Sequence, residues 1–178
     1  METTILFDPV NAQHAALIPS FADIHIACTE VDHTIVTFTP PLKREVIIEW
    51  WKARAADVVD GTRIIVMALA EDTEGQQRLV GYVILYRPLT ETGPFRGGVE
   101  KLLVSPNFRR IARKLMERLE KEAKLKGQTL LMLDTETGSP AETVYHNLGY
   151  NKLGIIPNYG MSPIDGRLIA GTFFWKQL

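Results

Sequence analysis

The sequence predicts a mixed α/β (α+β) fold in which a mostly antiparallel sheet, with a central parallel strand pair, is flanked by helices. Two runs rich in β-branched and apolar residues, Thr62–Ala70 and Leu79–Arg87, surround a polar turn and indicate a hairpin. Val99–Val104, Ile111–Lys126 and Thr129–Leu133 then alternate as strand, amphipathic helix and strand. Such a crossover within one sheet makes a parallel pair, and hairpins at either end add antiparallel neighbours.

The chain before the hairpin predicts a short strand and then helices. Ile5–Phe7 is a short apolar run that indicates a strand, and Ala12–Cys28 has mostly helical spacing, which Pro19 interrupts. Lys43–Val59 follows two prolines and repeats apolar residues at helical spacing until Gly61 ends the helix.

The chain after the crossover predicts one more helix and two strands. Ser139–Glu142 reads Ser-Pro-Ala-Glu, a capping box with proline at the first helical position, and Gly149 ends the helix that begins there. Tyr150–Ile156 and Leu168–Trp175 predict two final strands. Because no repeat or linker-like segment interrupts this order, we expect a single domain over residues 1–178.

Composition narrows the class of protein and its partners. Apolar residues make up 46% and charged residues 23% of the 178, with a net charge of −1, which favours a globular protein without overall attraction to nucleic acid or anionic lipid. Cys28 is the only cysteine, and no Cys or His spacing predicts a metal site. We therefore expect a cytoplasmic monomer or homodimer without a metal, membrane or nucleic-acid partner.

Four cations gather where the strand Val99–Val104 gives way to the next helix. The segment from Ser105 to Lys114 reads Ser-Pro-Asn-Phe-Arg-Arg-Ile-Ala-Arg-Lys. The free N–H groups and partial positive charge of a helix N-terminus, together with guanidinium groups, can bind a pyrophosphate. A solvated, charged helix face is the alternative interpretation of this cluster.

Four segments in a fixed order carry a resemblance to a known family. They read VEKLLVSP at 99–106, RRIARKLM at 109–116, LMLDTETGS at 131–139 and VYHNLGY at 144–150. In this order they resemble the GNAT superfamily of N-acetyltransferases, and more narrowly the tabtoxin-resistance type that acetylates small molecules; IPNYG at 156–160 is also similar to that subgroup. The resemblance implies a GNAT-like sheet and acetyl-CoA as co-substrate.

The loop before the central helix departs from the family pattern, (Q/R)-x-x-G-x-(G/A). If Arg109 leads and Ala112 closes the motif, only two residues lie between them, where the family has four, and the central glycine is missing. Glycine allows the backbone to approach phosphates closely, so we expect weakened CoA binding or a reshaped loop. The resemblance still implies that backbone groups of Leu103 and Val104 bind the pantetheine. It places the diphosphate at Arg109, Arg110, Ile111, Ala112, Arg113 and Lys114.

Three residues are candidates for catalysis. The resemblance places Tyr145 where many family members have a tyrosine that protonates the departing thiolate, whereas helical spacing alone fits a core tyrosine. Glu100 lies in the strand before the basic segment and Asp134 ends the strand before the capped helix, so either carboxylate is a candidate base for the amine. Either one is alternatively a salt-bridge partner, for Lys101 or Arg113.

Aromatic residues are candidates for an acceptor wall. Trp50, Trp51 and Tyr159, with Phe38, are placed to form it, although core packing explains each of them more simply. Adjacent residues on a helix point about 100° apart, so at least one tryptophan should face away from the deepest core.

The expected function is acetyl transfer from acetyl-CoA to the amine of a small molecule by direct attack on the thioester, with detoxification as the role that the resemblance suggests. Two alternatives remain open from the sequence. One is a non-catalytic acyl-CoA-binding or sensing domain, in which the shortened loop marks lost turnover. The other is protein or peptide N-acetylation, which needs an extended groove where a small amine needs a closed pocket.

Overall fold

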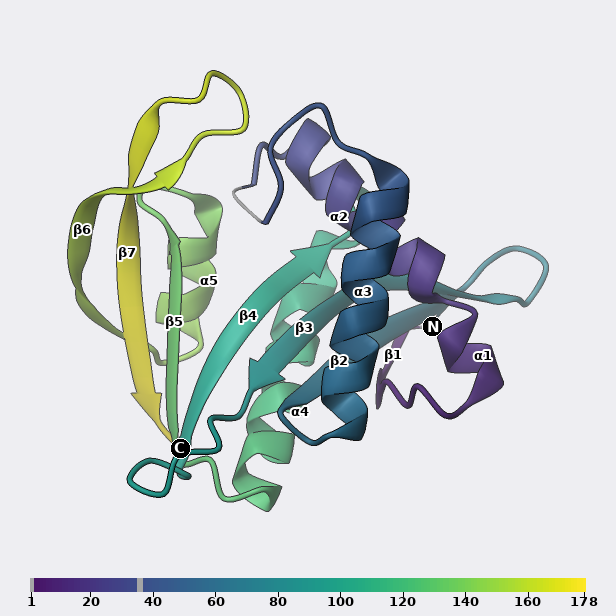
Figure 1. The fold of residues 1–178 in the computed structure, drawn as a ribbon, viewed down its shortest axis with the longest axis horizontal. Coiled ribbons are helices and arrows are strands. Elements are labelled where there is room, and N and C mark those ends of the chain that lie inside the picture. The colour runs from purple at the N-terminus through teal and green to yellow at the C-terminus, as the bar shows by residue number, and fades with distance from the viewer. Residues whose placement is uncertain (1, 35–36) are drawn as a thin grey trace.

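A seven-stranded mixed sheet with helices on both faces forms the framework of the chain (Figure 1). The computed structural model describes residues 2–34 and 37–178, except for the side chain of Arg109. The strand order is β1-β2-β3-β4-β5-β7-β6, and β4–β5 is the parallel pair. This confirms the predicted fold class. The strands are β1 Glu2–Leu6, β2 Arg63–Glu71, β3 Gln77–Tyr86, β4 Arg96–Val104, β5 Leu130–Glu136, β6 Asn151–Met161 and β7 Leu168–Gln177.

The helices divide between the two faces of the sheet. Figure 1 shows α2 and α3 in front of β2–β4, with α4 behind them. The helices are α1 Ala12–Ala15, α2 Ile18–Val31, α3 Arg44–Val59, α4 Ala112–Leu125 and α5 Pro140–Asn147, and a 3₁₀ segment, η1, spans Pro106–Ile111. No described helix combines the length and the apolar character needed to cross a lipid bilayer.

Two apolar cores lie on opposite faces of this sheet. Along β2, Val66 and Ala68 pack with α4, whereas Ile65 and Met67 pack with α2 and α3. This is the period-2 alternation of a strand, and both faces are apolar because each is covered by helices.

The central parallel pair is short, and this creates space in the middle of the sheet. β4 and β5 are paired only from Arg96–Leu130 to Gly98–Met132. Beyond that point the two strands diverge towards their carboxyl ends, as Figure 1 shows. Residues 99–104 of β4 therefore have no pairing partner on β5.

The structure tests two local predictions. The predicted interruption of the helical stretch Ala12–Cys28 is confirmed, since α1 and α2 are separate helices. The break precedes Pro19, which lies in the first turn of α2, where a missing N–H is harmless. Ser139 does precede α5, but its side chain makes no capping hydrogen bond. Its hydroxyl pairs with that of Thr135 at 3.2 Å, and the Glu142 carboxylate accepts from the hydroxyl of Thr172.

Candidate active site

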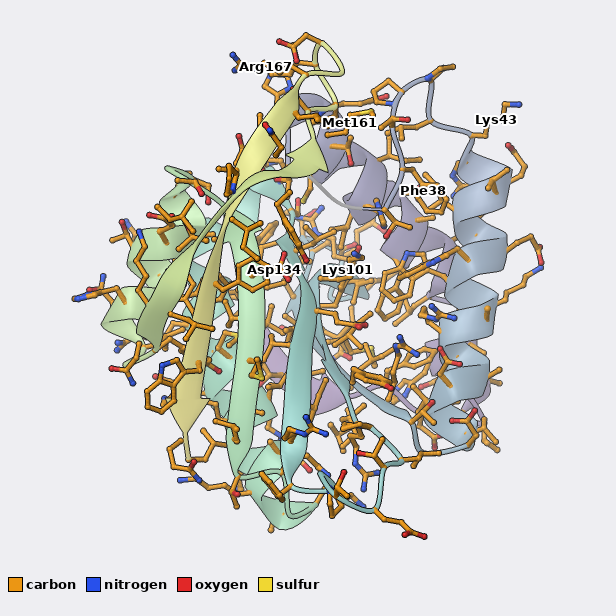
Figure 2. The ribbon with its side chains drawn as sticks, turned by 60° about the vertical axis from the view of Figure 1, so that its left-hand side comes forward. Phe38, Lys43, Lys101, Asp134, Met161 and Arg167 are labelled. Carbon is orange, nitrogen blue, oxygen red and sulfur yellow. The ribbon has the colours of Figure 1, made fainter. Side chains whose placement is uncertain are left out.

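A cavity of about 840 Å³ opens where β4 and β5 separate. It is lined by residues of β4, β5, α3, α5 and the β6–β7 hairpin. Its volume falls within the usual range for small-molecule sites, roughly 300–1,000 Å³. In Figure 2, Asp134 on β5 and Lys101 on β4 lie next to each other at this opening.

Asp134 lies at the centre of the site. Its side chain is accessible from the cavity, yet burial raises the pKa of its carboxyl, and the nearby charge of Lys101 lowers it in part. The negative charge of Asp134 in turn helps to raise the pKa of Tyr145 and of Tyr159, after burial in each case. A carboxylate with a raised pKa is a better proton acceptor than an ordinary one.

Glu100, the other candidate base, is held in an ion-pair network. Its carboxylate accepts from Nε of Arg63 at 3.2 Å, and Nη1 of Arg63 donates to Asp57 at 2.8 Å. Nε of Arg54 lies 2.6 Å from the same Asp57 oxygen. Glu100 lines the cavity, and its cationic partner is Arg63. The sequence alone suggests Lys101 or Arg113 as that partner.

Tyr145 reaches the cavity from α5. Its ring packs against Tyr150 and Phe174, with ring centroids 5.9 and 5.8 Å apart, and only 6% of the residue is exposed. Burial raises the pKa of its phenol well above the ordinary value, so the hydroxyl stays protonated at neutral pH. Tyr145 is thus both a packed residue, as helical spacing alone suggested, and a proton donor facing the site.

The aromatic wall is formed by three of the four predicted side chains. Trp50 and Phe38 line the cavity with ring centroids 6.3 Å apart, and Tyr159 lines it from β6, packed on Phe173. Trp51 does not contribute, and that prediction is corrected: it is 2% exposed and lies in the core. The two tryptophans diverge because adjacent helix positions point about 100° apart.

Lys101 is a site residue that the sequence indicated only as a salt-bridge partner. The β3–β4 register slips between Tyr82 and Ile84, and Lys101 lies in the resulting bulge with a φ of 53°. A bulge redirects side chains, and such torsions are uncommon outside glycine. Other cavity residues that sequence reasoning missed as part of the site include Arg54, Arg63 and Glu136. Local spacing carries no signal for them, because strand register and the packing of α3 on the sheet bring them together.

The predicted diphosphate residues do not line the cavity. Arg110 is exposed, Arg113 donates to the Asn147 carbonyl at 3.1 Å, and Nζ of Lys114 lies 3.4 Å from Glu2. The side chain of Ile111 is buried in the core, so only its backbone is available to a ligand. Ala112 is the first residue of α4, and Leu103 and Val104 lie on the β4 segment that has no partner on β5. The predicted contribution of the Arg109 side chain lies outside the described residues.

The shortened loop before α4 is helical. The segment Pro106–Ile111 is 3₁₀, is kinked at Phe108, and continues directly into α4. No described residue between Leu102 and Lys126 has a positive φ, in agreement with the missing glycine. The first turn of α4 contains no acidic residue and includes Arg113 and Lys114, so this part of the helix carries positive charge that favours an anion. The guanidinium of Arg78, 5.2 Å from the Phe108 ring, adds a cation from β3.

A parallel pair that diverges over a cavity and a basic helix start after β4 characterise the candidate site. Residues 19–150 match the Acetyltransferase (GNAT) family, and the chain belongs to this family. This confirms the family that the motifs predicted and agrees with acetyl-CoA as the co-substrate.

Solved structures share the fold at low sequence identity. A GNAT superfamily phosphinothricin acetyltransferase from Sinorhizobium meliloti, in complex with AcCoA, is 21% identical, with a TM-score of 0.75 over 99% of this chain and 89% of that chain. Ribosomal-protein-alanine N-acetyltransferase from Brucella melitensis is 23% identical, with a TM-score of 0.71 over 92% and 95%. N-acetyltransferase from Staphylococcus aureus Mu50 is 15% identical, with a TM-score of 0.74 over 99% and 98%.

Proposed function

We propose that the chain transfers the acetyl group of acetyl-CoA to the amine of a small molecule. The observation that carries this proposal is the single cavity at the divergence of β4 and β5, which is lined by both a carboxylate with a raised pKa, Asp134, and a protonated phenol, Tyr145. One of these groups can accept a proton from the acceptor ammonium, and the other can stabilise the departing thiolate.

The proposed reaction is direct. Asp134 removes a proton from the ammonium, through water or by contact, and the neutral nitrogen attacks the thioester carbonyl. The carbon–sulfur bond breaks, and Tyr145 donates its phenolic proton or a hydrogen bond to the sulfur. We assign oxyanion stabilisation to a backbone N–H of β4 beyond Gly98, where no β5 residue pairs with the strand. Cys28 is 2% exposed and does not line the cavity, which supports a route without an acetyl-cysteine intermediate.

The donor is proposed to lie against β4 and the start of α4. The edge of β4 that faces β5 has no strand partner at Leu103 and Val104, which suits the amides of the pantetheine. The basic start of α4, with Arg110, Arg113 and Lys114, suits the diphosphate. The acetyl end would then lie between the strands, beside Asp134 and Tyr145.

A small acceptor is favoured over a peptide by the size and lining of the cavity. Trp50, Phe38 and Tyr159 line a space of about 840 Å³, a volume within the usual range of small-molecule sites. We therefore retain the tabtoxin-resistance type, with a detoxifying role, as the more specific proposal; a relative of the same fold is a phosphinothricin acetyltransferase.

The test is thiol release from acetyl-CoA in the presence of a panel of amines, with acetylated products identified by mass. We expect amine-dependent release in the wild type and a loss of about 10² or more in Asp134→Asn. Release that no amine accelerates, with CoA still bound, would support the non-catalytic alternative. Acetylation of peptides alone would support the peptide transferase.

A further inference from the structure

The three cations that line the cavity differ in their partners. Arg54 and Arg63 both contact Asp57, at 2.6 and 2.8 Å, and Arg63 also reaches Glu100 at 3.2 Å. Within the described part of the chain, the ammonium of Lys101 makes no hydrogen bond or ion pair, although it lines the same cavity. The positive charge available to a ligand is therefore that of Lys101.

The carboxylate of Asp134, on the neighbouring strand β5, also has no charged or hydrogen-bonding partner among the described residues. Burial raises the pKa of Asp134, and the charge of Lys101 is near enough to offset part of that rise. Burial lowers the pKa of Lys101, and the charges of Glu100 and then Asp134 offset part of that fall. The two charges are neighbours without direct contact, because β4 and β5 diverge after Gly98 and Met132.

The charged groups that act on Lys101 are the carboxylates of Glu100 and Asp134 and the guanidinium groups of Arg63 and Arg54. Glu100 is already paired with Arg63, and neither carboxylate contacts the ammonium, which leaves an anion of a ligand as its partner. Burial and the charge of Lys101 lower the pKa of His25 to about 4, so this buried ring is neutral and contributes no competing charge. Lys101 also holds an uncommon backbone torsion in the β4 bulge, and torsions of this kind concentrate at functional sites. Burial lowers the pKa of Lys101, which is the sign that water solvates its ammonium incompletely.

We propose that the acceptor is zwitterionic, with its amine bound at Asp134 and a carboxylate or similar anionic group of the same molecule bound by Lys101. Lys101 is then the residue that selects amino-acid-like acceptors over simple amines and diamines. This inference rests on the proposed function of the cavity and adds the class of its substrate. A single molecule that places opposite charges a few bonds apart pairs both groups, whereas a diamine leaves the ammonium of Lys101 unpaired and repelled.

The experiment compares each of a panel of α-amino acids with its amide and with the amine that lacks the carboxyl group. In the wild type we expect kcat/KM for the best amino acid to exceed that for its amide by at least tenfold, as for a hydrogen bond between charged groups. Lys101→Met should abolish this preference by raising KM for the acid alone, and Lys101→Arg should retain part of it. Lys121→Met, an exposed lysine on α4 outside the cavity, is the matched control.

Binding of the same ligands, measured calorimetrically with CoA present, separates this inference from the proposed reaction. If the wild type binds the acid more tightly than the amide, and Lys101→Met removes this preference, the inference is supported. If, in addition, no amine is acetylated, the proposed transfer is contradicted and the inference about binding still stands. Equal binding and turnover of acid and amide, a preference for a diamine, or an equal loss on acid and amide in Lys101→Met would overturn it. Thermal unfolding of each variant, together with the Lys101→Arg result, guards against misfolding as the cause.

Discussion

Removing the hydroxyl of Tyr145 should separate its chemical role from its structural one. In Tyr145→Phe the ring keeps its contacts with Tyr150 and Phe174, and the lost hydroxyl has no hydrogen bond to any described residue. We therefore expect the free energy of unfolding to change by less than about 0.5 kcal/mol.

The effect on turnover should be much larger. Loss of a general acid usually lowers the rate by roughly 10²–10⁴. The pKa of Tyr145 is raised, so it is a weaker acid than a thiol of pKa about 8.5, and complete proton transfer to the sulfur is unfavourable. We expect the lower end, a fall in kcat of about 10², equivalent to ~2.7 kcal/mol in the barrier.

The assay is thiol release at saturating acetyl-CoA and acceptor, with KM for acetyl-CoA determined in parallel. Tyr150→Phe is the matched control, because it makes the same change in the same buried cluster at a residue that does not line the cavity. An unchanged kcat in Tyr145→Phe, or an equal fall in Tyr150→Phe, would refute the assignment. Since a raised pKa keeps Tyr145 protonated, the pH dependence of kcat in Tyr145→Phe should match that of the wild type below about pH 10.

Four further changes test other parts of the site. Burial raises the pKa of Asp134, so its ionisation opposes folding. The protonated carboxyl contributes favourably to the free energy of unfolding below the unfolded-state pKa of 3.8, and this contribution is lost as pH rises through the higher folded-state pKa. Asp134→Asn should thus be at least as stable as the wild type at pH 7, and a clear fall in its unfolding temperature there would contradict this reasoning. A Cβ at Gly171 would lie 2.5 Å from the Tyr159 ring, so Gly171→Ala should raise KM for the acceptor by up to about tenfold and leave KM for acetyl-CoA unchanged. Arg110→Ala should weaken calorimetric CoA binding by about fivefold, as for ~1 kcal/mol from an exposed charge, whereas Lys121→Ala on the same helix should not. In the same measurement, insertion of Arg-Gly after Arg110 should strengthen CoA binding if the short loop is a defect, and no gain would identify an adapted loop.

The order of the elements followed from the sequence, because the signals involved are local. The continuous apolar, β-branched run within Arg63–Glu71, the proline at the start of Pro140–Asn147 and the glycine after it each act within a few residues. The crossover rule then placed the parallel pair, and the ordered motifs identified the family. Proximity of Asp134 and Tyr145 was also predictable, since the carboxyl end of a strand and the helix that follows it lie at one edge of a sheet.

What the tertiary structure alone decided was how individual side chains are partnered. Glu100 has its partner in Arg63, 37 residues earlier in the chain, because the sheet register brings the two together. A one-residue bulge in β4 directs Lys101 into the cavity, and no feature of the sequence predicts this bulge. Trp51 faces the core while Trp50 faces the cavity, and that choice depends on the rotation of the whole helix against the sheet. Periodicity specifies which face of an element is buried, whereas the pairing of charges across the site depends on distances that only the packed strands and helices determine.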